Sequence, residues 1–154
     1  MAAAAAVMRS QSLCTMITDG RSGPTARVVQ PRRPDADLTV HVGTSPGSRK
    51  AKQVEATSSA VLAYQARRDQ AGVVAYCTAE VVTDPRVRRR YFMPLWRAFW
   101  PAGPSHDFVV IRCVPHTLEV WDIRRGITPE PFGLRSGRVV RDGDTWVRRP
   151  AGER

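Results

Sequence analysis

The stretch TSPGSRKAKQV, residues 44–54, joins an alternating apolar pattern before it to a short helical pattern after it. A turn of small residues offers free backbone N–H groups, and the N-terminus of a helix adds partial positive charge. Ser48 adds a hydroxyl group, and Arg49 and Lys50 add two full charges. Such a turn suits a phosphate group, although an ordinary capping turn with solvated cations obeys the same local rules.

Two short apolar runs near the N-terminus, residues 13–17 and 26–29, are separated by a turn that contains Gly and Pro. This pattern predicts a β-hairpin. Arg27 stands in the middle of the second run and should face the side opposite to Ala26 and Val28. A solvent-exposed cation is the ordinary interpretation of such an arginine.

The run that leads into the turn has a clear period of two. Leu38, Val40 and Val42 alternate with Thr39 and His41. The alternation predicts a half-buried strand that delivers the chain to the turn at residue 44.

Further apolar runs and a helix follow the turn. We expect strands over residues 58–65, 73–82, 108–114 and 118–121, with a turn at Pro115-His116 between the last two. Asp84 and Pro85 are typical of a helix start, as N-cap and first helical residue. Pro94 predicts a break in that helix near Met93.

These elements predict a mainly β fold, a small β-barrel of six or seven strands with two short helices at its rim. Residues 1–11 form an N-terminal extension, residues 12–123 the barrel domain, and residues 124–154 an extended tail. Within the tail, Asp142-Gly143 predicts one weak hairpin, with Trp146 as its only large apolar anchor.

The composition favours a folded, basic protein. The chain has 154 residues, is 42% hydrophobic, and carries a formal charge of +10 from 24 basic and 14 acidic residues. This size and apolar content support one core, and the charge favours anionic partners: nucleic acid, an anionic membrane or a phosphorylated small molecule. Part of the arginine excess is also what a GC-rich genome produces.

The three cysteines, Cys14, Cys77 and Cys113, lie singly in apolar runs. No close pair forms a zinc or redox motif, so we interpret them as core residues in a reducing compartment. No apolar run is long enough to span a membrane, and the first strand, expected from about residue 12, leaves little room for a removable leader. The cytoplasm is the expected location.

The sequence lacks the common catalytic motifs. No hydrolytic triad, Rossmann or P-loop signature, paired carboxylates or metal-ligand spacing is present. His41, His106 and His116 are scattered, and we interpret them as surface or loop residues. The arginines within residues 86–90 suit either a nucleic-acid patch or a solvated helix face, and their spread around the helix favours the second interpretation.

Several stretches resemble, in the same order, the pyridoxamine 5'-phosphate oxidase-like split barrels. The opening hairpin is similar in Asp19-Gly20, Pro24 and Ala26-Arg27-Val28-Val29, and the phosphate turn in Thr44 and Ser48-Arg49-Lys50. Trp100-Pro101, Gly103-Pro104, residues 107–115 and Glu119-Val120-Trp121-Asp122 resemble the general stress protein branch of that family. The resemblance covers roughly residues 12–123.

The resemblance implies an FMN-binding split barrel of about six antiparallel strands, working as a homodimer with flavin at the subunit interface. The residues matching the phosphate-binding positions are Arg27, Ser48, Arg49 and Lys50. Those matching the strand backbones that run along the flavin are Val28, Val29, Gly43 and Thr44. Trp121 matches a residue that reaches the cofactor of the partner subunit.

Three departures from the family pattern limit the expected activity. A Gln that contacts flavin in true oxidases is replaced near Ala71, and no Arg-x-His motif for pyridoxal phosphate follows Trp121. The N-terminal helix usual before the first strand is truncated or absent. We expect an FMN-dependent oxidoreductase of the general stress type, acting on an unknown small molecule. The alternatives are a non-enzymatic flavin-binding stress protein, a deazaflavin-dependent reductase and, third, a nucleic-acid-binding barrel.

Overall fold

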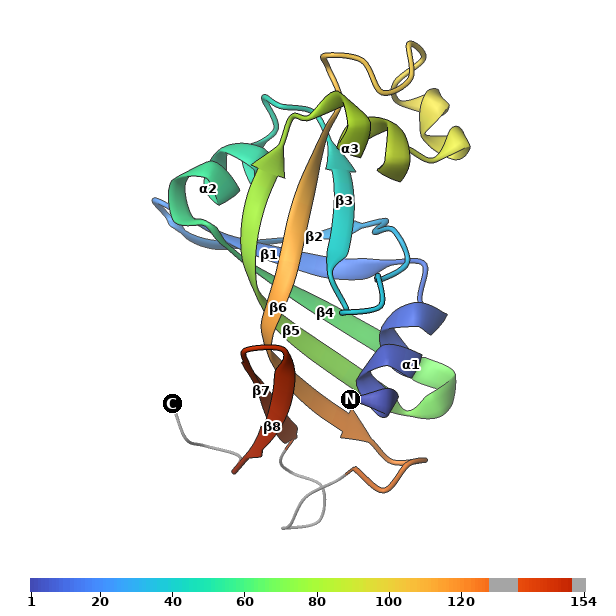
Figure 1. Cartoon of the computed structure of the whole chain (residues 1–154), viewed down its shortest axis with the longest axis vertical. Coiled ribbons are helices and arrows are strands. Elements are labelled where there is room, and N and C mark those ends of the chain that lie inside the picture. The colour runs from blue at the N-terminus through green and yellow to red at the C-terminus, as the bar shows by residue number, and fades with distance from the viewer. Residues whose placement is uncertain (128–135, 151–154) are drawn as a thin grey trace.

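A computed structural model describes residues 1–127 and 136–150 of the chain. Within these residues it contains one eight-stranded antiparallel sheet with the order β2-β1-β4-β5-β6-β7-β8, and β3 pairs with β6 (Figure 1). The strands are β1 (Cys14–Gly20), β2 (Gly23–Val29), β3 (Val40–Thr44), β4 (Ser59–Ala66), β5 (Ala71–Val82), β6 (Val109–Asp122), β7 (Gly137–Asp142) and β8 (Thr145–Arg149). The helices are α1 (Ala2–Ser10), α2 (Arg49–Thr57), α3 (Pro85–Tyr91) and the 3₁₀ segments η1 (Arg67–Asp69) and η2 (Pro94–Ala98).

The long strand β6 organises the molecule. Its first half pairs with β3, its second half pairs with β7, and β5 pairs with it along almost its whole length. In Figure 1, β6 runs from the end that carries α2 and α3 down to the β7–β8 hairpin. One strand therefore connects the two halves of the fold.

The predicted fold class is confirmed, and most of the predicted elements are present. The opening hairpin, the helix after residue 48 and the hairpin around Asp142-Gly143 all form. Asp84 caps α3 by accepting a hydrogen bond from the Arg86 N–H, and the chain leaves the helix before Pro94. The described residues contain eight strands and three α-helices, slightly more than predicted.

The predicted turn at Pro115-His116 is wrong, because β6 is continuous from Val109 to Asp122. Tyr76 pairs with Thr117 and Cys77 pairs with Pro115, so the register shifts by one residue. A β-bulge of this kind accommodates a proline, which cannot donate to the ladder, without ending the strand.

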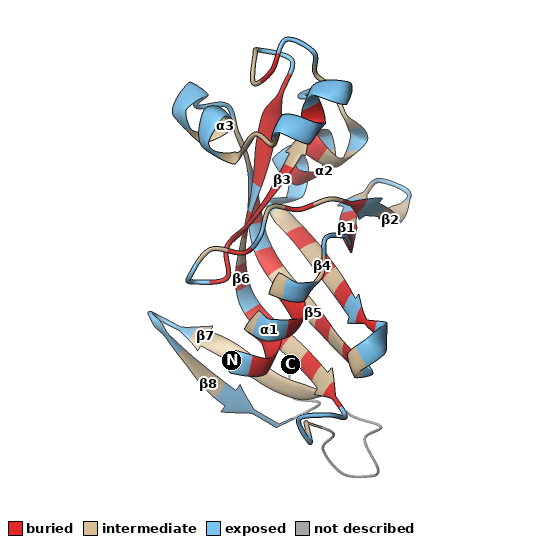
Figure 2. Cartoon of the chain, turned by 90° about the vertical axis from the view of Figure 1, so that its right-hand side faces the viewer, coloured by how far each residue is buried: buried red, intermediate tan, exposed pale blue. Residues whose placement is uncertain are grey.

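The N-terminal helix, expected to be truncated or absent, is present as a short helix. Residues 2–10 form α1, and its Ala4, Val7 and Met8 are fully buried. Figure 2 shows this buried face against β4 and β5, where buried residues alternate with less buried ones. An Ala-rich segment has high helix propensity, and packing on the sheet stabilises a helix this short.

The strand before the turn is buried on both faces, not one. Thr39, Val40, His41 and Val42 are all buried, and Leu38 lies in a turn with φ of 68° rather than in the strand. His41 stacks on Tyr91 of α3, with 3.5 Å between ring centroids. The interpretation of His41 as a surface residue is therefore wrong. The alternating pattern predicted that Thr39 and His41 face solvent, but α3 covers the face of the strand on which His41 lies.

The buried apolar residues form two clusters, and the larger one includes all three cysteines, which are buried free thiols, as predicted. Burial raises the pKa of Cys14 to about 11 and that of Cys77 to about 12. These thiols are therefore un-ionised at neutral pH and behave as small apolar side chains.

Candidate functional site

The turn between β3 and α2 is closed by a chain of hydroxyl contacts. Ser48 is the N-cap of α2, and its Oγ accepts hydrogen bonds from the Ala51 N–H at 3.3 Å and from Thr44 Oγ1 at 2.9 Å. Lys50 Nζ reaches back and donates to Thr44 Oγ1 at 3.0 Å. The side chains of Thr44, Ser48 and Lys50 thus converge on the first turn of the helix.

Arg27 reaches the same region from β2. Its guanidinium donates to Thr18 Oγ1 at 2.7 Å, to Gln53 Oε1 at 3.1 Å and to the Met16 carbonyl at 3.3 Å. The interpretation of Arg27 as a free surface cation is therefore wrong. The hairpin and α2 hold its head group between them.

The cations Arg27, Arg49 and Lys50 affect one another electrostatically, and with Thr44 and Ser48 they form a group that we call the cradle. Burial, and next the charge of Arg49, lower the pKa of Arg27. Burial, and next the charge of Arg27, lower the pKa of Lys50. Among the described residues, no carboxylate forms an ion pair with Arg27, Arg49 or Lys50. Like charges brought together without a counter-ion are costly, and a bound anion would offset that cost.

An open hollow of about 710 Å³ adjoins the cluster. It lies between the turn of the β1–β2 hairpin and α2, and its lining contains three cations, Arg21, Arg49 and Lys52, and one carboxylate, Asp19. Gln53 also lines it and connects it to Arg27. The positive charge therefore extends from the cradle into an accessible space.

Trp96, Trp100 and Phe108 pack together as an aromatic cap on β3 at Gly43. A Cβ on Gly43 would lie 2.5 Å from Trp96 and 2.7 Å from Phe108, so glycine lets these rings approach the strand. Trp100 Nε1 donates to Ser45 Oγ at 3.2 Å and to the Asp107 carbonyl at 3.1 Å. The cap thus supports the turn directly.

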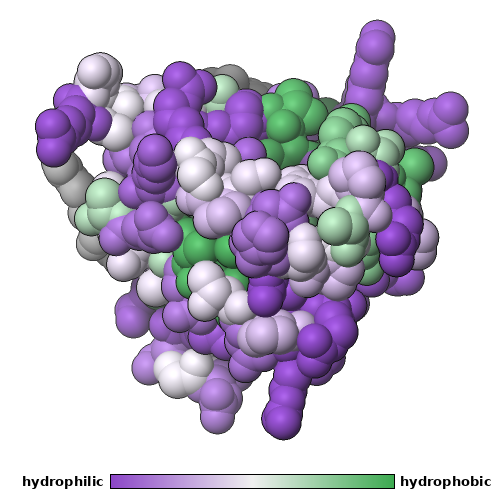
Figure 3. All heavy atoms as spheres, turned by 90° about the horizontal axis from the view of Figure 1, so that it is seen from above, coloured by the Kyte–Doolittle hydropathy of each residue, from purple (hydrophilic) through white to green (hydrophobic). Residues whose placement is uncertain are grey.

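The cap also carries exposed apolar surface. Leu95 is 67% exposed and Phe99 is 72% exposed. Figure 3, which views the molecule from above, shows apolar side chains among a mainly hydrophilic surface at this end. Arg88 of α3 points inward and donates to the carbonyls of Ser105 and Phe108, so it holds the loop before β6. The arginines of α3 therefore do not form one solvated face.

The four other predicted site residues lie in different environments. Val28 is 67% exposed on β2, whereas its neighbour Val29 is buried. Gly43 faces the aromatic cap. Trp121 pairs with Gly72 at the end of β6 opposite to Val109, which pairs with Thr44. Within one chain, the structure brings Arg27, Thr44, Ser48, Arg49 and Lys50 together, and it leaves Trp121 on the far half of the strand.

Sequence reasoning missed Thr18 and Gln53. Gln53 lies four residues after Arg49, so both face the same side of α2, and this helical spacing was the available signal. Thr18 could not be identified, because only the pairing of β1 with β2 places it beside Arg27.

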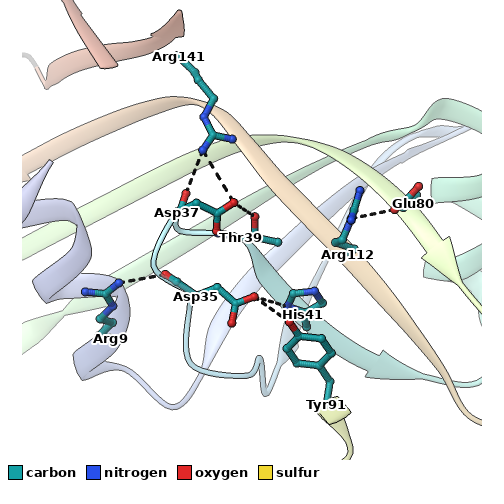
Figure 4. A network of polar contacts seen from close by, with 9 residues as sticks. All are labelled: Arg9, Asp35, Asp37, Thr39, His41, Glu80, Tyr91, Arg112 and Arg141. Carbon is teal, nitrogen blue, oxygen red and sulfur yellow. Dashed lines mark hydrogen bonds and ion pairs between the residues drawn. The ribbon is translucent and has the colours of Figure 1, made fainter. Parts of the chain in front are cut away.

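A second polar network fixes the loop before β3 (Figure 4). Asp35 Oδ2 accepts a hydrogen bond from the Tyr91 hydroxyl at 2.8 Å and lies 3.6 Å from His41 Nδ1. Burial, opposed by Asp35 and assisted by Arg112 and Arg90, lowers the pKa of His41 to about 4. The imidazole is therefore neutral at pH 7, and its contact with Asp35 is not an ion pair at that pH.

The same loop is tied to two other elements. Arg9 of α1 donates to the Asp35 carbonyl at 3.0 Å, and Arg141 of β7 lies 3.9 Å from Asp37 Oδ2. Figure 4 shows these contacts arriving from separate directions. The loop thus joins α1, α3 and the β7–β8 hairpin.

The described residues contain no group of three or more His, Cys, Asp or Glu side chains arranged to hold a metal ion. In the same part of the chain, no helix combines the length and apolar character needed to cross a bilayer.

Comparison with known proteins identifies both a family and a fold. A family model described as pyridoxamine 5'-phosphate oxidase like matches residues 3–134. A protein from Clostridium acetobutylicum related to general stress protein 26 has a TM-score of 0.68 and 14% identity, over 76% of this chain and 84% of its own. No curated protein sequence matches this chain.

Two further solved structures share the fold. A pyridoxamine 5'-phosphate oxidase-related, FMN-binding protein from Nostoc punctiforme has a TM-score of 0.66 and 16% identity, over 99% of this chain and 95% of its own. An F420 reductase has a TM-score of 0.57 and 13% identity, over 73% of this chain and 93% of its own.

Proposed function

Because the chain belongs to the pyridoxamine 5'-phosphate oxidase-like family, we propose that it binds FMN and acts as a flavin-dependent oxidoreductase of the general stress protein type. The observation that carries this proposal is the cluster of Arg27, Arg49 and Lys50, which has no carboxylate ion pair among the described residues.

The residues present fit a flavin phosphate. A phosphate dianion needs several donors and more than one positive charge. Arg27, Arg49 and Lys50 supply the charge, Ser48 and Thr44 supply hydroxyl groups, and the first turn of α2 supplies free N–H groups. The exposed apolar side chain of Val28 would give the flavin ring a surface beside the cradle.

The bound flavin would supply the redox chemistry, a hydride or electron transfer, and the protein would supply binding and orientation. No described residue near the cradle stands out as an acid or a base. His41 is uncharged, buried and stacked on Tyr91. Pyridoxamine phosphate oxidation is not proposed, because the Arg-x-His motif expected after Trp121 is missing.

The deciding experiment compares flavin binding by matched variants. The purified protein should show a flavin absorption spectrum, or gain one on addition of FMN. Arg49→Ala combined with Lys50→Ala should abolish binding, because each charged hydrogen bond contributes about 1.5–3 kcal/mol. Arg86→Ala combined with Arg89→Ala removes two exposed arginines of α3 and should leave the FMN affinity unchanged.

Two results would contradict the proposal: a colourless protein that ignores added FMN, or equal FMN affinity in the Arg49/Lys50 variant. Turnover with NAD(P)H and an electron acceptor separates an oxidoreductase from a non-enzymatic flavin-binding stress protein. Salt-dependent nucleic-acid binding that is lost in the α3 variant would instead support the nucleic-acid alternative.

A deazaflavin is the second candidate cofactor, favoured by the hollow that Arg21, Arg49 and Lys52 line. A deazaflavin coenzyme such as F420 carries an anionic tail beyond its phosphate, and this hollow offers positive charge beside the cradle. Titrations with FMN and with F420 under the same salt conditions would decide between them. Tighter FMN binding would reject the deazaflavin.

We also propose a homodimer with flavin at the subunit interface. Trp121 lies on the half of β6 remote from the cradle, so it could reach a flavin only in a second copy of the chain. The three buried free thiols suit a reducing compartment such as the cytoplasm.

A further inference from the structure

Gln53 stands at the junction between α2 and the β1–β2 hairpin. Its Oε1 accepts hydrogen bonds from Thr18 Oγ1 at 2.7 Å and from Arg27 at 3.1 Å. Its Nε2 donates to Thr25 Oγ1 at 3.0 Å. Thr18 Oγ1 in turn accepts a bond from Arg27 at 2.7 Å, so Arg27, Thr18 and Gln53 form a closed ring of contacts.

The orientation of the Gln53 amide is fixed by its partners. Thr25 takes the amide donor, so the amide oxygen must face Thr18 and Arg27. The amide packs closely against Gly20 on one side, because a Cβ on Gly20 would lie 2.4 Å from Gln53 Nε2. Thr18 is only 2% exposed, whereas Arg27 and Gln53 are half-buried, so the ring is buried on the Thr18 side and borders the open hollow on the Gln53 side.

The residue type at position 53 has an electrostatic consequence. A carboxylate at this position would hold a guanidinium equally well, but it would cancel the positive charge of Arg27. An amide offers the same acceptor oxygen without net charge. Arg27 is therefore oriented by neutral groups, and its charge stays available to an anion.

We propose that Gln53 is a positioning residue that aims the Arg27 guanidinium at the bound phosphate while leaving its charge uncancelled. The inference rests on the proposed function of the cradle. It also gives α2 a second role, because the helix that carries Ser48, Arg49 and Lys50 sets the position of a cation on another element.

The test measures FMN affinity in Gln53→Glu, Arg27→Ala and the double variant, with thermal unfolding to check the fold. Gln53→Glu should stay folded, since the new carboxylate pairs with Arg27, and should lose at least about tenfold in FMN affinity. Since Gln53 acts through Arg27, the double variant should bind no more weakly than Arg27→Ala alone.

Two further variants separate charge from shape. Gly20→Ala displaces the amide without changing charge and should also weaken FMN binding. Gln11→Glu makes the same chemical change outside the cradle and should leave the affinity unchanged.

Equal FMN affinity in wild type and Gln53→Glu, or additive losses in the double variant, would overturn the role of Gln53. Absence of FMN binding by the wild-type protein is a different result, which would overturn the proposed function and this inference with it.

Discussion

Arg27 is the residue whose interpretation changes most between the sequence and the structure. In the sequence it is one of many arginines and occupies a strand position that commonly faces solvent. In the structure its head group is held by Thr18, Gln53 and the Met16 carbonyl. Its pKa is lowered by burial and by Arg49. Neutral groups satisfy N–H donors of this guanidinium, but no carboxylate among the described residues balances its charge. We infer that a bound anion supplies the missing negative charge.

Gly43 permits the aromatic cap to pack on β3. Gly43→Ala should lower the free energy of unfolding by about 1–3 kcal/mol, because its Cβ would overlap Trp96 and Phe108. Chemical denaturation measures the change. Gly47→Ala is the matched control, since nothing lies within 4 Å of a Cβ there, and it should be nearly neutral. Equal stability of both variants would contradict the packing argument.

His41 should make the protein sensitive to acid. Its folded pKa is about 4, below the ordinary value near 6.5, so the unfolded chain takes up the proton first as pH falls. Stability contributed by the neutral imidazole is therefore lost between about pH 6.5 and 4, by about 1–3 kcal/mol.

His41→Phe keeps a ring against Tyr91 but cannot be protonated. Urea denaturation across this pH range should show a shallower loss of stability in the variant than in the wild type. The groups around the imidazole, Asp35, Asp37, Arg90 and Arg112, remain in both proteins and cancel in the comparison. Identical pH profiles would show that His41 does not titrate as inferred.

Among the elements, α1 differs most from the prediction, because the sequence did not show that this segment packs on the sheet. It buries Val7 and Met8 completely against the sheet, and Arg9 ties it to the loop before β3. Short helices owe most of their stability to such packing rather than to propensity. We therefore expect α1 to be part of the cooperative fold.

Met8→Ala tests that expectation. The loss of a fully buried side chain should lower the free energy of unfolding by about 2–5 kcal/mol. Met8→Leu conserves volume and should cost less than about 1.5 kcal/mol. Thermal and chemical unfolding give both values. A negligible effect of Met8→Ala would mean that α1 is not docked on the sheet in solution.

For the whole molecule, the main question is how many copies of the chain build one site. The cradle lies at one end of β6 and Trp121 at the other. Trp121→Ala should weaken FMN binding without altering the cradle residues of its own subunit. Size-exclusion chromatography with light scattering should give twice the mass of the chain.

Mixed dimers test the sharing directly. Subunits with Arg49→Ala and Lys50→Ala are unfolded and refolded together with Trp121→Ala subunits. Each mixed dimer should then contain one intact site, formed by the cradle of the second subunit and Trp121 of the first. Recovery of FMN binding in the mixture supports a shared site, and no recovery would place Trp121 outside it.

The sequence by itself determined the local features of this protein. Hydrophobic alternation and turn residues specified the opening hairpin, and Ser48 and Asp84 specified the starts of α2 and α3. The motif order identified the family. Residues 44–50 predicted an anion-binding turn, which stays a prediction. These are short-range signals, because each depends on neighbours within a few residues.

Only the tertiary structure decided which residues far apart in the sequence come into contact. It continued β6 through Pro115, buried His41 beneath α3, and docked an Ala-rich segment as α1. It also placed Thr18 and Gln53 around Arg27 and kept Trp121 away from the cradle. The reason is physical: strand pairing and helix packing join residues far apart in sequence, and no local pattern encodes which of them will meet.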